Sequence, residues 1–450
     1  MYYLLYADAS GKLFEHPSLG AAGRTGDYIV DLDESDLVEL PRGASLVMVP
    51  GRAPVGVDRR GRFTVLEHAP ARFRTGAAAS SRGGRSTVKP DAVRSGAGKA
   101  AQNAGPALVY AVGALLPQGF TRTLLPAYRR GKDGAPLPLF GYTAVAGRSG
   151  KVYAAARLTA DPGPWDPVHY NTPDLPGRVE QKLAALPENR ILKQLARCAL
   201  EYRCFTAQNL FYGCREGGIP VSPACNADCL GCISLQPSGC CPSPQARIDF
   251  LPGAREVAEL AVPHLNGEAG AIVSFGQGCE GEPALAAETV AGSIRLIRLV
   301  TGRGTVNMNT NGGHTAGVAE IAAAGLDAVR VSLISAREDT YTAYYRPRGY
   351  GLDDVRRTLV QCAAAGVYTS LNLLVMPGLN DGREEAAALV EFVKETGVQL
   401  VQLRNLNIDP DFLFERVPRQ SSELLGIDGL IAALEEVEGL RVGSYSRPVR

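Results

Sequence analysis

The sequence predicts an α/β protein in which a β-rich N-terminal domain with a disordered insertion precedes a partial (β/α)6 barrel of the TIM type. Three observations lead to this prediction. Short strand-like stretches separated by glycine and aspartate fill about the first 72 residues, and a stretch without aromatic residues, leucine or isoleucine follows them. From about residue 215 onward, strand and helix patterns alternate, which predicts a parallel sheet with right-handed crossovers.

The length, charge and cysteine content narrow the class of protein. With 450 residues the chain is long enough for two or three domains, and its net charge of +1 gives no overall attraction to nucleic acid or membranes. No apolar run is long enough to span a membrane, and the first residues do not form an export signal. Nine of the ten cysteines lie between Cys198 and Cys279, so we expect reduced thiols in a cytoplasmic protein.

The β-rich N-terminal domain is predicted over residues 1–170. Glycine, alanine and serine dominate the segment 76–105, which we expect to be a flexible linker or insertion. The expected strands are residues 28–30, 45–49 and 63–66, followed by a hairpin of residues 137–146 and 151–158 around the turn 147–150.

The predicted insertion carries a local positive charge, with five Lys or Arg residues against the single acid Asp91. Such a charge could attract RNA. A solvated tether is favoured, because no aromatic side chains are interleaved to stack on bases. Nucleic acid is therefore not an expected partner.

The second half of the chain is predicted to hold a helical bridge over residues 171–214, the barrel over 215–410 and a C-terminal extension over 411–450. We count about six βα units from Ile219 to Asn407, fewer than the eight of a closed barrel. The expected strands are residues 271–275, 305–309, 328–334, 368–376 and 398–406, and the expected helices are 284–300, 314–324, 352–365 and 384–396.

Three cysteines form the most informative motif. Cys225, Cys229 and Cys232 have C-x3-C-x2-C spacing on a loop after the short apolar run 219–221. Three thiolates in this spacing suit a [4Fe–4S] cluster, which leaves one iron open for a non-protein ligand. The alternative is a structural zinc site whose fourth ligand comes from elsewhere. Candidates for that fourth ligand are Cys240, Cys241 and Cys279.

Two later turns give the cysteine loop its context. Gly281-Glu282-Pro283 follows one predicted strand, and Asn309-Thr310-Asn311-Gly312 ends the next. In this order the motifs resemble the radical S-adenosylmethionine (SAM) superfamily over roughly residues 215 to 410. The chain departs from that family's Gly-Gly-Glu-Pro turn at Glu280, which stands where the first glycine is usual.

The resemblance implies a function and a set of ligands. It implies a [4Fe–4S] cluster on Cys225, Cys229 and Cys232, with SAM chelating the open iron through its amino and carboxylate groups. It also implies reductive cleavage of SAM to a 5′-deoxyadenosyl radical, oxygen sensitivity, and an electron donor of the flavodoxin or ferredoxin type. The residues expected to bind SAM are Gly281, Glu282, Pro283, Asn309, Ser332 and Asn372.

Several of these residues also have structural readings. Pro283 suits the first turn of a helix, and the hydroxyl of Ser332 could bond to the backbone of its strand. On the last predicted strand, Gln402 and Arg404 face the barrel interior if alternation holds, where Arg404 could pair with a carboxylate of substrate or cofactor, or they face solvent.

The remaining cysteines allow two interpretations. A second cluster is one of them, and reduced thiols that pack as small apolar side chains are the other, which is favoured because adjacent cysteines rarely both bind one metal. The cysteines in question are Cys204, Cys214, Cys240 and Cys241.

Two functions follow from the sequence. The first is a radical SAM enzyme that abstracts hydrogen from a peptide, a protein or another sizeable substrate. The second is a non-catalytic iron–sulfur or zinc protein that serves in interaction or electron transfer.

Overall fold

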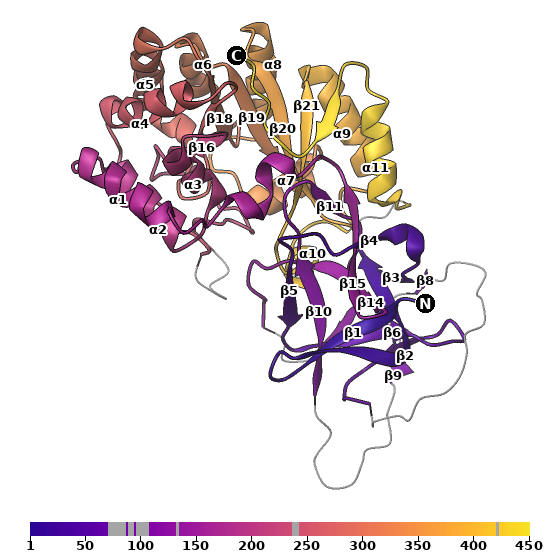
Figure 1. Cartoon of the computed structure of the whole chain (residues 1–450). Helices are drawn as coiled ribbons and strands as arrows, with labels where there is room; N and C mark the ends of the chain where they lie inside the picture. The colour runs from indigo at the N-terminus through magenta and orange to yellow at the C-terminus, as the bar shows by residue number, and fades with distance from the viewer. Residues whose placement is uncertain (71–86, 89–93, 96–107, 132–134, 236–242, 420–422) are drawn as a thin grey trace. The chain divides into compact units, whose positions relative to one another are not determined.

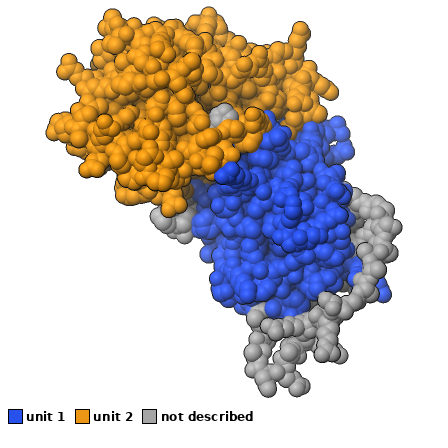
Figure 2. All heavy atoms as spheres, in the orientation of Figure 1, with its two compact units in different colours: residues 1–159, 375–383, 405–430 blue, residues 160–374, 384–404, 431–450 orange. Residues whose placement is uncertain are grey.

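The computed structural model describes residues 1–70, 87–88, 94–95, 108–131, 135–235, 243–419 and 423–450. The chain forms two compact units that interleave in the sequence (Figure 2). Unit 1 comprises residues 1–159, 375–383 and 405–430, and unit 2 comprises residues 160–374, 384–404 and 431–450.

Unit 1 is built on a large, mainly antiparallel sheet, which confirms the predicted β-rich N-terminal part. The predicted hairpin is present as β14 and β15, but its first strand begins later than expected, because Pro136 and Pro138 cannot donate to a ladder. The strands are β1 Tyr3–Asp8, β2 Leu13–Thr25, β3 Tyr28–Asp31, β4 Leu37–Glu39, β5 Ser45–Val49, β6 Arg52–Val57, β7 Phe63–Val65, β8 Thr87–Val88, β9 Arg94–Ser95, β10 Val109–Leu115, β11 Phe120–Arg122, β12 Leu125–Pro126, β13 Tyr128–Arg130, β14 Thr143–Arg148 and β15 Lys151–Leu158.

The predicted insertion 76–105 lies outside the described residues except for β8 and β9. β8 pairs with β3, and β9 pairs with β7.

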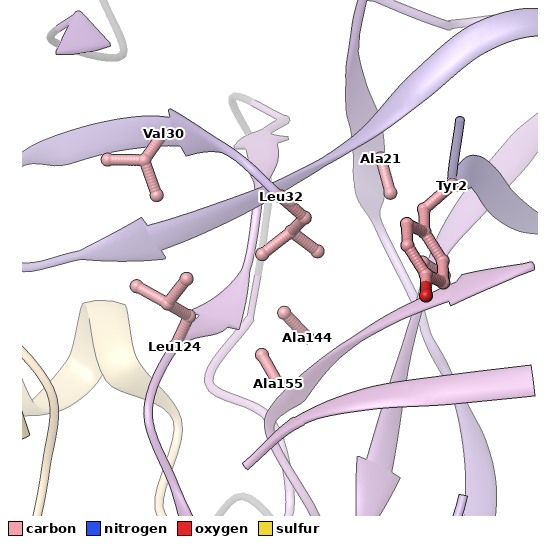
Figure 3. Close-up of a cluster of buried hydrophobic side chains, with 8 residues drawn as sticks. Tyr2, Ala21, Val30, Leu32, Leu124, Ala144 and Ala155 are labelled. Carbon is pink, nitrogen blue, oxygen red and sulfur yellow. The ribbon is translucent and has the colours of Figure 1, made fainter. Parts of the chain in front are cut away.

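One buried cluster shows how the sheet of unit 1 packs. Tyr2, Val30, Leu32 and Leu124 bring large side chains against alanines of β2, β14 and β15 (Figure 3). Small side chains at these positions let strands approach closely while the larger ones fill the space between them. The cluster comprises Tyr2, Ala21, Val30, Leu32, Leu124, Ala144, Ala146 and Ala155.

A buried ion pair joins the segment after residue 405 to the sheet of unit 1. Arg52 on β6 lies 3.2 Å from Asp409, and both side chains are almost fully buried, with 0% and 1% exposure. Asp409 also accepts a hydrogen bond from the backbone N–H of Leu137 at 2.9 Å. Burial raises the pKa of Asp409, so its charge depends on these partners.

We expect Asp409→Asn to lower the free energy of unfolding by about 3–5 kcal/mol, because it leaves a buried guanidinium without its nearest carboxylate. Urea denaturation measures the effect. As a control, Glu39→Gln removes a carboxylate from the exposed pair with Lys151, and stability should be nearly unchanged. Equal losses in the two variants would contradict the prediction.

The second sheet confirms the predicted partial barrel. Its strands follow chain order, β16 to β20 pair in parallel, and β21 pairs in parallel with β22 (Figure 1). The strands are β16 Glu216–Gly218, β17 Ile272–Phe275, β18 Thr305–Thr310, β19 Ala328–Leu333, β20 Tyr368–Val375, β21 Leu400–Asn405 and β22 Arg441–Gly443.

Helices connect these strands, and several neighbouring helices contact one another. The predicted bridge is helical as α1 Leu175–Ala185, α2 Arg190–Leu200 and α3 Phe205–Tyr212. The helices of the barrel part are α4 Ala254–Gly267, α5 Ala287–Val300, α6 Thr315–Ala323, α7 Glu338–Tyr345, α8 Leu352–Ala364, α9 Arg383–Thr396, α10 Pro410–Phe414 and α11 Gly426–Glu435. In the part of the chain that the structure describes, no helix has the length and apolar character needed to cross a membrane.

The structure contains elements that were not expected, and one expected strand is displaced. The first strand is Glu216–Gly218, just before the apolar run. Glu216 is buried in the sheet although it is charged, so the hydropathy of the sequence did not indicate a strand here. Helix α4 was not predicted, since it contains Pro263, which normally ends a helix. The C-terminal segment adds β22 as a seventh strand.

Candidate active site

The cysteine loop is attached to the Gly-Glu-Pro turn through the backbone. The N–H of Gly281 donates to the carbonyl of Ser222 at 2.7 Å, and the N–H of Glu282 donates to the carbonyl of Ala224 at 2.7 Å. A Cβ atom on Gly281 would lie 2.0 Å from the oxygen of Ala224, so no larger residue fits there. The two segments therefore pack backbone against backbone.

Glu282 joins the third motif to the same place. Its carboxylate accepts hydrogen bonds from the backbone N–H groups of Asn311, at 2.7 Å, and Ala284, at 3.0 Å, and from the hydroxyl of Thr310. The side chain of Asn311 then donates to Asn226 of the cysteine loop at 2.7 Å. Three motifs far apart in sequence thus meet through direct contacts.

The three motif cysteines lie together on this loop, and all three are partly accessible. Burial raises the pKa values of Cys225 and Cys229, and the neighbouring thiols of the motif add to the rise. Thiolates held this close repel one another, so a positively charged group is needed to keep them ionised. The donor set fits an iron–sulfur cluster on Cys225, Cys229 and Cys232.

Arg247 contacts the last of these cysteines, which the sequence did not indicate. One guanidinium nitrogen lies 3.6 Å from the sulfur of Cys232, and Nε donates to the hydroxyl of Ser234 at 3.2 Å. The hydroxyl of Ser234 donates to the carbonyl of Glu280 at 2.9 Å. Arg247 is therefore a cation in direct contact with the thiol of Cys232, and its charge also acts on Cys225.

Glu280 has a structural role that explains its departure from the family's turn. Its carboxylate accepts from the backbone N–H groups of Val221, Ser222, Gly276 and Gln277, at N···O distances of 2.5 to 3.2 Å. Burial raises the pKa of Glu280 to about 8, and the four N–H groups oppose this by favouring the ionised form. The residue fastens the start of the cysteine loop to the end of β17.

Helix α7 supports the cysteine loop from another side. The N–H groups of Asp228 and Leu230 donate to the carbonyls of Tyr345 and Tyr344, both at 3.0 Å. The side chain of Arg346 donates to the carbonyl of Asp228 at 2.7 Å. The aromatic run at the end of α7 was a signal in the sequence, but only the fold shows that it lies against this loop.

The comparisons with known proteins match this geometry. Residues 219–390 match the family model described as the radical SAM superfamily. This part of the chain is a radical SAM domain. Over 108 residues it is 37% identical to the GTP 3′,8-cyclase of Paenarthrobacter nicotinovorans, an alignment that covers 24% of this chain and 29% of the cyclase.

Two solved structures are among those to which part of the chain is similar. A radical SAM methyltransferase from Sphaerobacter thermophilus has 16% identity and a TM-score of 0.35, and the match covers 51% of this chain and 65% of the other. SuiB of Streptococcus suis, bound to its precursor peptide SuiA, has 12% identity and a TM-score of 0.35, over 56% of this chain and 53% of SuiB. The chain therefore spans only part of the proteins it matches.

Inside the radical SAM domain, a buried polar network occupies the base of the parallel sheet. Glu216 on β16 forms an ion pair with Arg330 on β19 at 2.9 Å, and both side chains are nearly buried. Arg330 also donates to Asn309 at 2.5 Å and to Gln402 at 3.0 Å. The single charge in the apolar run of β19 was the signal for this network in the sequence.

Four residues that the sequence singled out contribute to this network: Asn309, Asn372, Gln402 and Arg404. The side chain of a fifth, Ser332, forms no hydrogen bond to the network among the described residues. Asn309 and Gln402 accept from Arg330, and Asn372 accepts from Arg404 at 3.0 Å. Ser332 is partly exposed and lies opposite Asn372 in the β19–β20 register.

Of the candidates for a second cluster, the structure describes Cys204 and Cys214, and each makes its own polar contact. Cys204 contacts the hydroxyl of Thr206 at 3.2 Å, and Cys214 donates to Asn209 at 3.6 Å, while Cys240 and Cys241 lie outside the described residues. Cys279, the remaining zinc candidate, is buried beside Cys198.

Among the residues that the structure describes, no three His, Cys, Asp or Glu side chains are placed as ligands of one metal ion. Two thiolates on one zinc lie about 4 Å apart, because each Zn–S bond is about 2.3 Å. The cysteines of a four-iron cluster each bind a different iron and lie further apart, so this finding does not bear on a cluster.

Proposed function

We propose that this chain is a radical SAM enzyme that holds a [4Fe–4S] cluster on Cys225, Cys229 and Cys232 and abstracts a hydrogen atom from its substrate. The observation that carries the proposal is the hydrogen-bonded meeting of the cysteine loop with the Gly-Glu-Pro and Thr-Asn-Gly turns. When bound, the cluster and SAM would supply one-electron cleavage of the sulfonium to methionine and a 5′-deoxyadenosyl radical.

The residues of the chain would position these groups. The cysteines would hold three irons, and the close backbone contact at Gly281 would fix the distance between the cysteine loop and the turn. The exposed polar groups at the carboxyl ends of the strands, Ser332 and Asn372, would face the nucleoside of SAM. Glu282 would act through the backbone of Asn311, since its carboxylate is already occupied by that turn.

We infer a sizeable substrate, such as a peptide or protein, and an external electron donor of the flavodoxin or ferredoxin type. The two edge strands of the sheet, β16 and β22, do not pair with each other in the described residues, which supports an open partial barrel. An open edge leaves room for a substrate larger than a metabolite. Thiols that must stay reduced favour a cytoplasmic location.

Anaerobic reconstitution with iron, sulfide, SAM and reductant tests the proposal. We expect a brown protein with stoichiometric iron and formation of 5′-deoxyadenosine. Stoichiometric zinc without iron after anaerobic purification, together with no binding of SAM, would instead support the non-catalytic metal protein.

A change at Arg247 gives a prediction that does not depend on turnover. Arg247→Gln removes a cation 3.6 Å from the sulfur of Cys232, and the more negative, reduced cluster loses the most stabilisation. The midpoint potential should become more negative by about 60 mV, which corresponds to a tenfold change for one electron. Potentiometric titration followed by electron paramagnetic resonance measures it.

Arg346→Gln is the matched control for Arg247. Arg346 also touches the cysteine loop, but it donates to the backbone carbonyl of Asp228 rather than to a thiol. The midpoint potential of the cluster should change much less in this variant than in Arg247→Gln. A shift of the same size in both variants would mean that general surface charge, and not the contact to Cys232, sets the potential.

A further inference from the structure

The polar network of the parallel sheet contains two guanidinium groups and one carboxylate among the described residues. Glu216 is the carboxylate of the polar network, and Arg330 and Arg404 are its cations. The carboxylate of Glu216 is fully engaged by Arg330 at 2.9 Å, by Ser274 at 2.7 Å and by Ser446 at 2.7 Å. One carboxylate therefore faces two guanidinium groups, and its close ion pair is with Arg330.

Arg404 is that second guanidinium. It donates from Nε to Asn372 and from Nη2 to Gln402, both at 3.0 Å, and it forms no ion pair with any described carboxylate. Its two acceptors are neutral amides. These bonds use two of the five N–H groups of an arginine, so three remain for a ligand.

Arg404 is more accessible to solvent than the other charged residues of the network. Arg330 and Gln402 are buried, whereas Arg404, two residues further along β21, is partly exposed, as are Ser332 and Asn372 at the same level. Burial lowers the pKa of Arg404 to about 10, and the charge of Arg330 adds to this. A cation in such surroundings is costly unless an anion pairs with it.

The C-terminal segment contacts the polar network through Ser446. Ser446 donates to Glu216 and accepts from Arg330, and the backbone N–H of Val449 donates to Thr305 at 2.9 Å. The phenol of Tyr445 is the remaining neighbour of Arg404 with a titratable group. An anion would therefore reach Arg404 from the carboxyl ends of the strands, where the motifs lie.

We propose that the substrate of this enzyme carries a carboxylate or similar planar anion, and that Arg404 binds it inside the partial barrel. The guanidinium fork suits bidentate binding of two oxygens, and Asn372 and Gln402 hold it in place. The proposal rests on the proposed function, because it assumes that the substrate enters the barrel. The carboxylate of SAM is a second source of the same chemistry, but the direct contacts of Arg404 are with β20 and β21 and not with the cysteine loop.

Bromide is a suitable probe, because it is a small anion that anomalous X-ray scattering locates. Crystals of the reconstituted full chain would be soaked in bromide with and without SAM. We expect bromide at the guanidinium of Arg404 in both cases. Arg404→Gln should lose this bromide, while Arg404→Lys, which keeps the charge, should retain it at lower occupancy.

The matched control is Arg356→Gln, which removes the same charge from an exposed ion pair on α8 and should leave the bromide in place. Absence of bromide at Arg404 in the wild type, or its persistence in Arg404→Gln, would overturn the proposal. Displacement of the bromide by SAM would assign the anion to the cofactor and overturn the substrate assignment. Since 5′-deoxyadenosine formation is measured separately, failure here leaves the proposed function standing.

Discussion

Replacing Cys225, Cys229 and Cys232 together by alanine should abolish both iron binding and the formation of 5′-deoxyadenosine. The three thiols are the ligands that we propose for the cluster, and their spacing places them on one loop. Without thiolates the cluster cannot be held, so the loss should be complete rather than partial. Iron and sulfide analysis and product detection after anaerobic reconstitution measure the two effects.

Cys362→Ala is the control for this triple substitution. Cys362 is a buried thiol on α8, outside the motif, and its replacement should cost some stability while leaving iron content unchanged. If the triple variant kept the iron content and product yield of the wild type, the assignment of the cluster would be wrong. If the control lost its iron as well, the triple variant would report on folding instead.

The second large effect is expected at Glu280. Glu280→Gln replaces one carboxylate oxygen by an NH2 group, which then faces two backbone N–H donors in place of an acceptor. Each buried donor left unsatisfied costs about 1–3 kcal/mol, so the loss should be about 2–6 kcal/mol. Because two of the donors, Val221 and Ser222, belong to the start of the cysteine loop, the affinity for SAM should fall as well.

Two further variants serve as comparisons for Glu280→Gln. Glu280→Gly restores the family's usual residue but leaves all four N–H groups without this acceptor, so it should be worse than the glutamine variant. Glu288→Gln makes the same chemical change on the exposed first turn of α5 and should have little effect. Urea denaturation and equilibrium dialysis with SAM measure both quantities, and wild-type values in Glu280→Gln would refute the role.

Much of the second unit could be predicted from local patterns. Helix α8 repeats apolar residues at three- and four-residue steps, and strands such as β19 and β20 are apolar runs bounded by turns. Such signals depend on neighbours in the sequence, so they survive without knowledge of the fold. At β16, tertiary packing buries the charged residue Glu216, which a local signal does not indicate. The first strand was therefore predicted a few residues too late in the sequence.

The candidate site was predictable only in part. The cysteine spacing and the two turns identified where chemistry is expected, because each motif is a short stretch of sequence. Glu280 was interpreted as a disturbance of its turn, since its four hydrogen-bond donors come from residues before the cysteine loop and at the end of β17. Arg247 gave no signal, because its neighbour Cys232 lies fifteen residues away in the sequence.

The sequence by itself determined the order of most strands and helices of the second unit, its parallel sheet and the three cysteines with their two supporting turns. Each of these depends on local periodicity or on a motif whose residues are adjacent in the chain. Only the tertiary structure decided how Glu216, Arg330 and Arg404 share their charges. The reason is physical: a buried charge is balanced by whatever the strand register places beside it, and that register brings together residues separated by more than a hundred positions.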